Sequence, residues 1–432
     1  MYDHHEPTRS PALFIHNARL NGTATDALIE NGTFTAIAPA LTPPEGAERL
    51  DAAGKLLVPA FYNAHTHAAM TFLRGYADDM ELFAWLNNHI WPAEGRLTSE
   101  DIYWGTQLAI LEMIHSGTVF FNDMYWEPEM ALRAADEMGV RAAIGRLYIE
   151  ASPGVILERN VLSTQALESA YRASSAKDRI QLTYAPHAVY TVSGITLRRI
   201  AEMARETGDR IHIHASETEK EVKDCMAANG MSPIAWLDTC GLLTSRTVLA
   251  HCVHLSEEDI AILNHRGTVA VHNPNSNFKL CSGQFDYRKV AEEARCRVAL
   301  GTDGCASNNS LSMFDEMKLA ALNAKIRSGD PTCGKAADIW RMATRDGAEA
   351  FGINAGVIAV GKLGDALLLD PDAPCLIPEH HLDANIVYAA DPSCVDTVIC
   401  AGRILMRNRR IDGEEAIIEA ARAQLARHTQ ST

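Results

Sequence analysis

LLVPAFYNAHTH, residues 56–67, shows the pattern that recurs along this chain: a short apolar run that ends in polar, chemically capable side chains. Segments with helical character separate such runs, because their apolar residues are spaced three and four apart and they end in Gly, as in 101–117 and 195–208. Strands that alternate with helices favour a sheet of parallel strands. The other runs of this kind are TVFFNDM (118–124), RAAIGRLYIE (141–150), IQLTYAPH (180–187), RIHIHASE (210–217), TVLAHCVH (247–254), TVAVHNPNSN (268–277) and RVALGTDG (297–304).

Residues 57–356 therefore predict an α/β catalytic domain with the (β/α)8 TIM-barrel fold. Such a barrel typically needs about 250 residues, and the extra length here would lie in the loops. The polar residues follow the strands at their carboxyl ends, which meet at the rim where the active sites of this fold are built. We therefore expect His and Asp residues that are far apart in the sequence to converge at that rim.

Both ends of the chain lie outside this pattern and resemble each other. Residues 1–56 contain short strand-like runs, and so does the tail from 357 to 432. We expect the two ends to form one small β-sandwich domain, with residues 414–427 as a closing helix.

The composition is that of an ordinary globular protein. Of the 432 residues, 47% are hydrophobic and 22% are charged. A formal charge of −16 argues against nucleic acid and anionic membranes as partners. We find no targeting segment and no membrane span, so we expect a cytoplasmic protein; a homo-oligomer is compatible with the sequence. The ten cysteines are scattered, without a C-x-x-C pair, and we expect them to be reduced.

Several histidines and acids at the ends of these strands have the chemistry of metal ligands. His65 and His67 alternate on one strand, so their imidazoles point to the same side. Alone, an H-x-H pair is weak evidence, because it is often two polar residues on a strand. His214, His251 and Asp303 at other strand ends make the set far more specific than any member.

These motifs resemble the amidohydrolase superfamily, and within it the 5'-methylthioadenosine/S-adenosylhomocysteine deaminases and their chlorohydrolase-like relatives. The resemblance covers nearly the whole chain. It implies that His65, His67, His214 and Asp303 are the metal ligands, and that Glu217, His251 and Asp303 are catalytic. The motifs are FYNAHTH (61–67), HIHASETEKE (212–221), LAHCVHL (249–255), HNPNSNFKL (272–280) and GTDGCASNNSLSMFDEM (301–317).

Two other histidines compete for these roles. His212 lies on the same strand face as His214, but the family pattern places the ligand three residues before the glutamate, which leaves His212 deeper in the barrel as packing. His254 competes with His251, and we assign it a supporting or structural role.

The fourth strand lacks the lysine that bridges two metals in binuclear relatives, so we expect one Zn²⁺ per chain, although iron or manganese could occupy the same site.

The resemblance implies the reaction as well. It is hydrolytic deamination of 5'-methylthioadenosine, S-adenosylhomocysteine or both, giving the inosine analogue and ammonia. The metal would lower the pKa of its bound water towards about 7. His251 and Asp303 would relay the proton, and Glu217 would protonate a ring nitrogen of the purine.

Four further residues match substrate-binding positions of these relatives. His187 matches a histidine that hydrogen-bonds the purine ring, with a capping or core His as the alternative. Glu94 matches a carboxylate that accepts the ribose hydroxyls, with a surface charge as the alternative. Arg146 matches an arginine near the amino-acid carboxylate of S-adenosylhomocysteine, and Arg159 aligns only weakly as its second arm. Residues 78–97 could form a lid, in which Phe83, Trp85 and Trp91 would either contact the substrate or simply pack.

Two rival interpretations remain open. The same site could deaminate guanine or a pterin, or hydrolyse a substituted triazine. A non-catalytic scaffold protein is a rival from another class, but such proteins usually lose metal ligands, and this chain keeps the full set.

Overall fold

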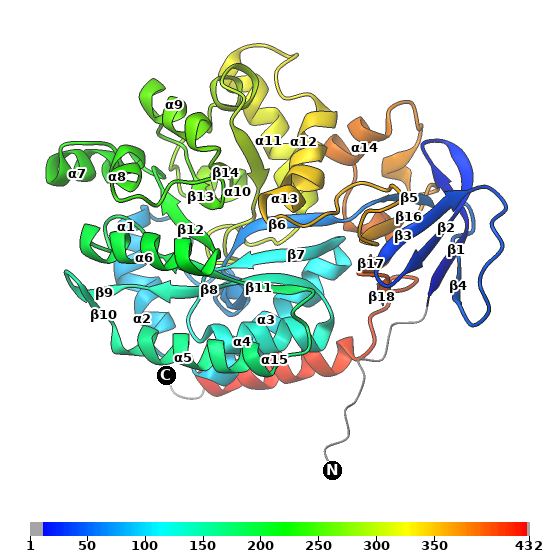
Figure 1. Ribbon diagram of the computed structural model, residues 1–432, viewed down its shortest axis with the longest axis horizontal. Coiled ribbons are helices and arrows are strands. Elements are labelled where there is room, and N and C mark those ends of the chain that lie inside the picture. The colour runs from blue at the N-terminus through cyan, green and yellow to red at the C-terminus, as the bar shows by residue number, and fades with distance from the viewer. Residues whose placement is uncertain (1–11, 430–432) are drawn as a thin grey trace.

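The computed structural model describes residues 12–429, and its centre is a barrel of eight parallel strands (Figure 1). Each strand pairs with its neighbour in chain order. The main-chain N–H groups of Thr302 and Asp303, just after the last strand, donate to the carbonyl of His65 on the first, at 3.1 and 3.0 Å. The predicted (β/α)8 fold is therefore confirmed. The strands are β6 (Phe61–Thr66), β7 (Thr118–Asp123), β8 (Arg141–Tyr148), β11 (Ile180–Pro186), β12 (Arg210–Ala215), β13 (Thr247–His251), β14 (Val269–His272) and β15 (Arg297–Leu300).

Helices surround this barrel, so almost every residue of its strands is buried. Local sequence sets their ends. Helix α3 begins after Thr98, which forms a reciprocal capping box with Asp101, and α4 ends at Gly139, whose φ of +78° suits glycine. The helices around the barrel are α3 (Ser99–His115), α4 (Pro128–Met138), α5 (Glu158–Ala173), α6 (Gly194–Thr207), α7 (Glu219–Asn229), α8 (Pro233–Thr239), α9 (Glu257–Arg266), α10 (Pro274–Lys279), α11 (Met313–Ser328), α12 (Ala336–Ala343), α13 (Arg345–Ala350) and α14 (Leu382–Tyr388).

The two ends of the chain meet in a second sheet of eight strands. It curls back on itself, since the N–H of Phe34 donates to Lys362 O at 2.9 Å and that of Gly364 to Gly32 O at 2.7 Å. The curled sheet encloses its own core, which includes Leu13, Ile29 and Phe34. Its strands are β1 (Leu13–Leu20), β2 (Thr23–Glu30), β3 (Thr33–Ala38), β4 (Glu48–Asp51), β5 (Leu56–Pro59), β16 (Ala366–Leu369), β17 (Val395–Cys400) and β18 (Arg403–Met406).

Strand β5 connects this terminal sheet to the barrel. It pairs with β1 and β16, and β6 begins two residues after it ends. Its side chains alternate: Leu57 lies in the core of the terminal sheet, while Leu56 and Val58 pack in the barrel core. The predicted division at 56/57 therefore cuts β5, which belongs to the terminal sheet.

The predicted closing helix is α15 (Glu414–Thr429), which packs against α3 beneath the barrel (Figure 1). His115 near the end of α3 contacts Glu414 at 3.0 Å.

The ten cysteines are all unpaired. Among residues 12–429, no helix combines the length and the apolar character needed to cross a membrane.

Candidate active site

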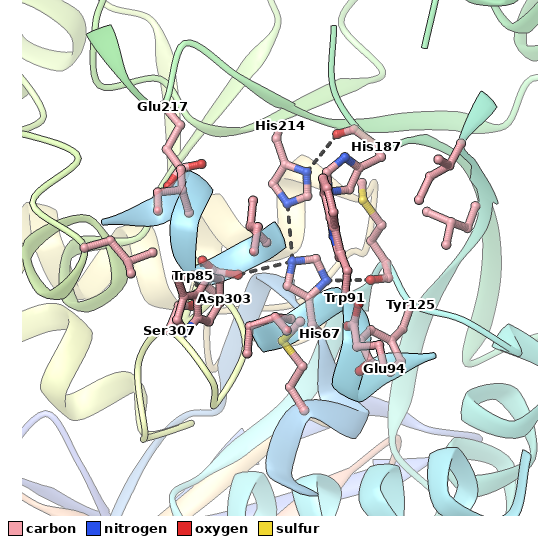
Figure 2. A pocket seen from close by; sticks show the side chains of 18 of the residues that line it. His67, Trp85, Trp91, Glu94, Tyr125, His187, His214, Glu217, Asp303 and Ser307 are labelled. Atoms are coloured by element: carbon pink, nitrogen blue, oxygen red, sulfur yellow. Dashed lines mark hydrogen bonds and ion pairs between the residues drawn. The ribbon is translucent and has the colours of Figure 1, made fainter. Parts of the chain in front are cut away.

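Side chains from three strand ends converge at the carboxyl rim of the barrel (Figure 2). His65 and His67 come from the end of β6, His214 from β12 and Asp303 from just after β15. The Oδ1 atom of Asp303 lies 3.3 Å from His65 Nε2 and 3.2 Å from His67 Nε2. His67 Nε2 in turn lies 3.3 Å from His214 Nε2. The structure thus brings the four predicted ligands to one point.

This cluster fits a divalent metal ion. The Nε2 atom of His65 is buried and has no hydrogen-bond partner among residues 12–429, although it faces the carboxylate of Asp303. Buried polar atoms normally have partners, and imidazole nitrogens with one carboxylate oxygen are a donor set that zinc accepts. His251 lies next to this set, because its ring nitrogen and those of His65 and His214 all lie within 4.8 Å of one another.

The imidazoles are oriented by hydrogen bonds at their other nitrogen. His67 Nδ1 lies 2.5 Å from the carbonyl of Met124, and His214 Nδ1 lies 2.7 Å from the carbonyl of His187. A carbonyl only accepts, so Nδ1 donates and Nε2 keeps its lone pair for a metal.

We expected His212 only to pack inside the barrel, but it also contacts one of the predicted metal ligands. It is fully buried one layer below His214, and its Nε2 lies 2.8 Å from Nδ1 of His65. His212 therefore orients a predicted ligand, as the carbonyls do for the other two histidines.

Asp303 is fixed by helix α10 and by its own loop. Its Oδ2 atom accepts from the hydroxyls of Ser276 at 2.6 Å and Ser307 at 3.0 Å. Its φ of +61° is unusual for a residue with a side chain and directs the carboxylate into the rim. Burial raises the pKa of Asp303, but His65 and His67 hold it well below the usual range.

Glu217 and His251 lie beside this cluster. Glu217 Oε1 accepts from the Ser282 hydroxyl at 3.0 Å, and Oε2 lies 3.8 Å from His251 Nε2. His251 Nδ1 lies 2.9 Å from Asn277 Oδ1, so Nδ1 donates and Nε2 is left to accept a proton. Burial raises the pKa of Glu217, which favours the protonated form of its carboxyl.

The cluster opens into a cavity of about 70 Å³, which we call the inner cavity. Glu94 and His187 both line it, as do Glu217 and Tyr190. The Glu94 carboxylate accepts from the indole N–H of Trp126 at 3.3 Å, and burial raises its pKa. The structure therefore brings two of the predicted substrate-binding residues to the metal cluster.

His187 is held by its own loop. Its Nδ1 lies 3.0 Å from the Thr191 hydroxyl, and its ring centroid lies 4.9 Å from that of His214. Burial and the nearby His67 and His65 together lower the pKa of His187 to about 3. The ring is therefore neutral and available for hydrogen bonding.

The segment expected to form a lid does cover the cavity. It contains α1 (Leu82–Trp85), the π-helical turn η2 (Leu86–Ile90) and α2 (Trp91–Glu94). Trp85 and Trp91 line the inner cavity, whereas Phe83 packs on the ring of Tyr190 with centroids 5.8 Å apart.

Arg146 is not brought to the cavity. Its guanidinium bonds to Glu168 at 3.1 Å and Asp209 at 3.0 Å, and it lies over the ring of Tyr184. Alternation along β8 turns the next side chain, Leu147, into the inner cavity and Arg146 toward the surrounding helices. The geometry gives no support to the predicted contact between Arg146 and a substrate carboxylate.

Arg159 lies nearer to the site but outside the inner cavity. It lines an outer cavity of about 460 Å³ together with Glu94 and Glu158. Its Nε bonds to Glu127 at 2.9 Å, and its guanidinium stacks over Trp126.

Sequence reasoning missed the residues that support the site. Ser276 and Asn277 stand in the HNPNSN motif, and they orient Asp303 and His251 from α10. The dense run of small polar residues directly after β14 could have indicated that these side chains support the site. Ser282, whose hydroxyl donates to Glu217, carried no such signal. His254, for which we expected a supporting or structural role, contacts the Ser282 carbonyl through Nε2 at 2.6 Å.

Comparison with known proteins agrees with this geometry. The sequence model of the amidohydrolase family matches residues 56–405. The chain is 46% identical over 379 residues to a 5'-deoxyadenosine deaminase of Methanoregula boonei, covering 88% of this chain and 85% of that protein. It is 44% identical over 387 residues to 5-methylthioadenosine/S-adenosylhomocysteine deaminase 1 of Archaeoglobus fulgidus, covering 88% and 90%. A solved adenosine deaminase from Xanthomonas campestris with bound zinc superposes with a TM-score of 0.88 at 33% identity, covering 96% and 98% of the two chains.

Proposed function

Because the chain belongs to the amidohydrolase family, we propose that it is a metal-dependent hydrolase that deaminates adenosine-type nucleosides. The substrates would be 5'-deoxyadenosine, 5'-methylthioadenosine or S-adenosylhomocysteine, which the names of its relatives contain, and the products an inosine analogue and ammonia. The observation that carries the proposal is the meeting of a metal-type cluster, a buried carboxyl and a neutral imidazole in one cavity.

We propose one zinc ion per chain, held by His65, His67, His214 and Asp303, with iron or manganese as alternatives for the same donors. A divalent metal there supplies Lewis-acid chemistry that makes water acidic enough to react near neutral pH. The zinc in the related Xanthomonas structure supports this assignment.

The protein's own groups would move the protons. Glu217 lies in the cavity beside His251 and has a raised pKa, so it can donate a proton to a ring nitrogen and make the adjacent carbon electrophilic. His251 holds its Nδ1 against the amide oxygen of Asn277, so its Nε2 is the nitrogen that would accept a proton from the attacking water and pass it to the leaving amine together with Asp303.

The proposed binding contacts follow from the cavity walls. The acceptor-only carboxylate of Glu94 suits the two ribose hydroxyls, and the neutral ring of His187 suits a purine nitrogen. We leave Arg146 out of the proposed contacts, because its guanidinium pairs with Glu168 and Asp209. Arg159 lines only the outer cavity, so its predicted contact with a charged tail requires a tail that leaves through that cavity.

A substrate panel tests the proposal. Ammonia release would be compared for 5'-deoxyadenosine, 5'-methylthioadenosine, S-adenosylhomocysteine, adenosine, guanine and a triazine, with zinc measured in the same preparation. Turnover of at least one adenosine compound is expected. Turnover of guanine or the triazine with none of the adenosine compounds would replace the proposed substrate class, and a protein that no added metal activates would support the scaffold alternative.

A further inference from the structure

A third space, which we call the side cavity, adjoins the inner cavity. It measures about 580 Å³ and shares Trp91, Trp126, Ile149 and Tyr190 with the inner cavity. The inner cavity is far smaller, at about 70 Å³. A group attached to a ligand in the inner cavity therefore has room to extend past these four side chains.

The walls of the side cavity are mostly apolar. They include Pro153, Leu157, Val189 and Val192 in addition to the shared residues. The one charged lining residue is Glu150, and no lysine or arginine lines this cavity in the described part of the chain.

The Glu150 carboxylate is already occupied. It accepts from the N–H of Gly154 at 3.1 Å, and from the N–H and the hydroxyl of Ser193 at 3.0 and 2.8 Å. A carboxylate on a ligand would find no cation here and would meet a negative charge, whereas an apolar group loses nothing on entering.

The position of Glu94 decides which part of a nucleoside reaches the side cavity. Glu94 lines the inner and outer cavities but not the side cavity. In a ribonucleoside, the C5' carbon leaves the ribose on the face opposite to the two hydroxyls. Hydroxyls bound to Glu94 therefore direct the 5' substituent away from Glu94, and the side cavity is the adjoining space that Glu94 does not line.

We propose that the side cavity binds a large, uncharged, apolar 5' substituent of the substrate. The inference rests on the proposed function, because it takes Glu94 as the ribose contact. If the side cavity binds such a group, derivatives of 5'-deoxyadenosine with a bulky alkylthio or arylthio group should be good substrates. A 5' group that ends in a carboxylate should be disfavoured. A methylthio group would fill only a small part of the 580 Å³.

The test compares kcat/KM for 5'-deoxyadenosine, 5'-methylthioadenosine, 5'-benzylthio-5'-deoxyadenosine and S-adenosylhomocysteine. We expect the benzylthio compound to equal or exceed the methylthio compound, and S-adenosylhomocysteine to be about tenfold poorer or worse. Turnover of none of the four would overturn the proposed function itself. Turnover of 5'-deoxyadenosine with strong rejection of the benzylthio compound, or with S-adenosylhomocysteine preferred, would overturn only the side-cavity proposal.

Two variants localise the effect. Val189→Phe narrows the side cavity, so the kcat/KM ratio of the benzylthio compound to 5'-deoxyadenosine should fall about tenfold. Val155→Phe is the matched control, because Val155 is 55% exposed and lines none of the three cavities, and it should leave the ratio unchanged.

Ser152→Arg provides an independent gain-of-function measurement in case Val189→Phe does not fold. Ser152 lines the side cavity and is exposed, so an arginine there can be solvated and still reach a bound carboxylate. The ratio of S-adenosylhomocysteine to 5'-deoxyadenosine turnover should rise several-fold. An unchanged ratio in this variant, or equal effects of Val189→Phe and Val155→Phe, would contradict the assignment.

Discussion

Arg141 and Asp365 form a buried ion pair that joins the barrel to the terminal sheet. Arg141 begins β8, and Asp365 directly precedes β16. The guanidinium donates to both carboxylate oxygens, at 2.7 and 3.2 Å, and the two side chains are 4% and 0% exposed. We predict that Arg141→Met strongly destabilises the protein.

The contacts of Asp365 set the magnitude. Without Arg141 the carboxylate keeps only the Tyr62 hydroxyl at 2.5 Å and the N–H of Ala401 at 2.6 Å. A buried charge that loses its counter-ion costs about 3–5 kcal/mol. The free energy of unfolding should fall by that amount in a urea titration followed by circular dichroism.

The double variant separates charge from packing. Arg141→Met with Asp365→Asn removes the uncompensated charge while keeping an acceptor for Tyr62, so it should be less destabilised than Arg141→Met alone. Lys223→Met is the control, because Lys223 and Glu219 form a surface pair with side chains 69% and 70% exposed, and it should leave stability unchanged. A loss below about 1 kcal/mol for Arg141→Met would refute the reasoning, because that is the range of exposed pairs.

Three further predictions concern the site. Glu217→Gln should lower kcat by about 10²–10⁴ while zinc content stays the same, and loss of zinc instead would make Glu217 a ligand. His212→Phe should weaken zinc binding by about 10–100-fold in a chelator competition, because His65 loses its orienting partner at 2.8 Å; unchanged affinity would return His212 to a packing role. Lys279→Met breaks the ion pair that ties Asp78 in the lid segment to α10, so KM for 5'-deoxyadenosine should rise, and an unaltered KM would show that the lid is held without it.

The sequence was sufficient for the barrel and the metal cluster because both depend on local patterns. A run of apolar residues ending in His or Asp marks a buried parallel strand and its carboxyl end, and the fold itself brings all such ends to one rim. His65, His67, His214, His251 and Asp303 could therefore be grouped from the sequence, and the structure places their side chains together. The choice of four of them as metal ligands came from the family resemblance.

The direction of Arg146 could not be read in the same way. Both faces of a barrel strand are covered, so β8 is buried almost throughout and its sequence RAAIGRLY shows no alternation of apolar and polar residues. Only tertiary structure decides that Leu147 faces the cavity and Arg146 the ion pairs with Glu168 and Asp209.

The sequence by itself determined the fold class and the chemistry of the rim, because strand periodicity and residue type are local properties. Tertiary structure alone decided which side chains are hydrogen-bond partners around the metal cluster, and what shape the cavities beside it have. His212 reaches His65 across the barrel, and the carboxylate of Glu150 accepts hydrogen bonds from Ser193 on another loop. Such contacts join residues distant in sequence, so only the packed chain can fix which charges remain free to meet a substrate.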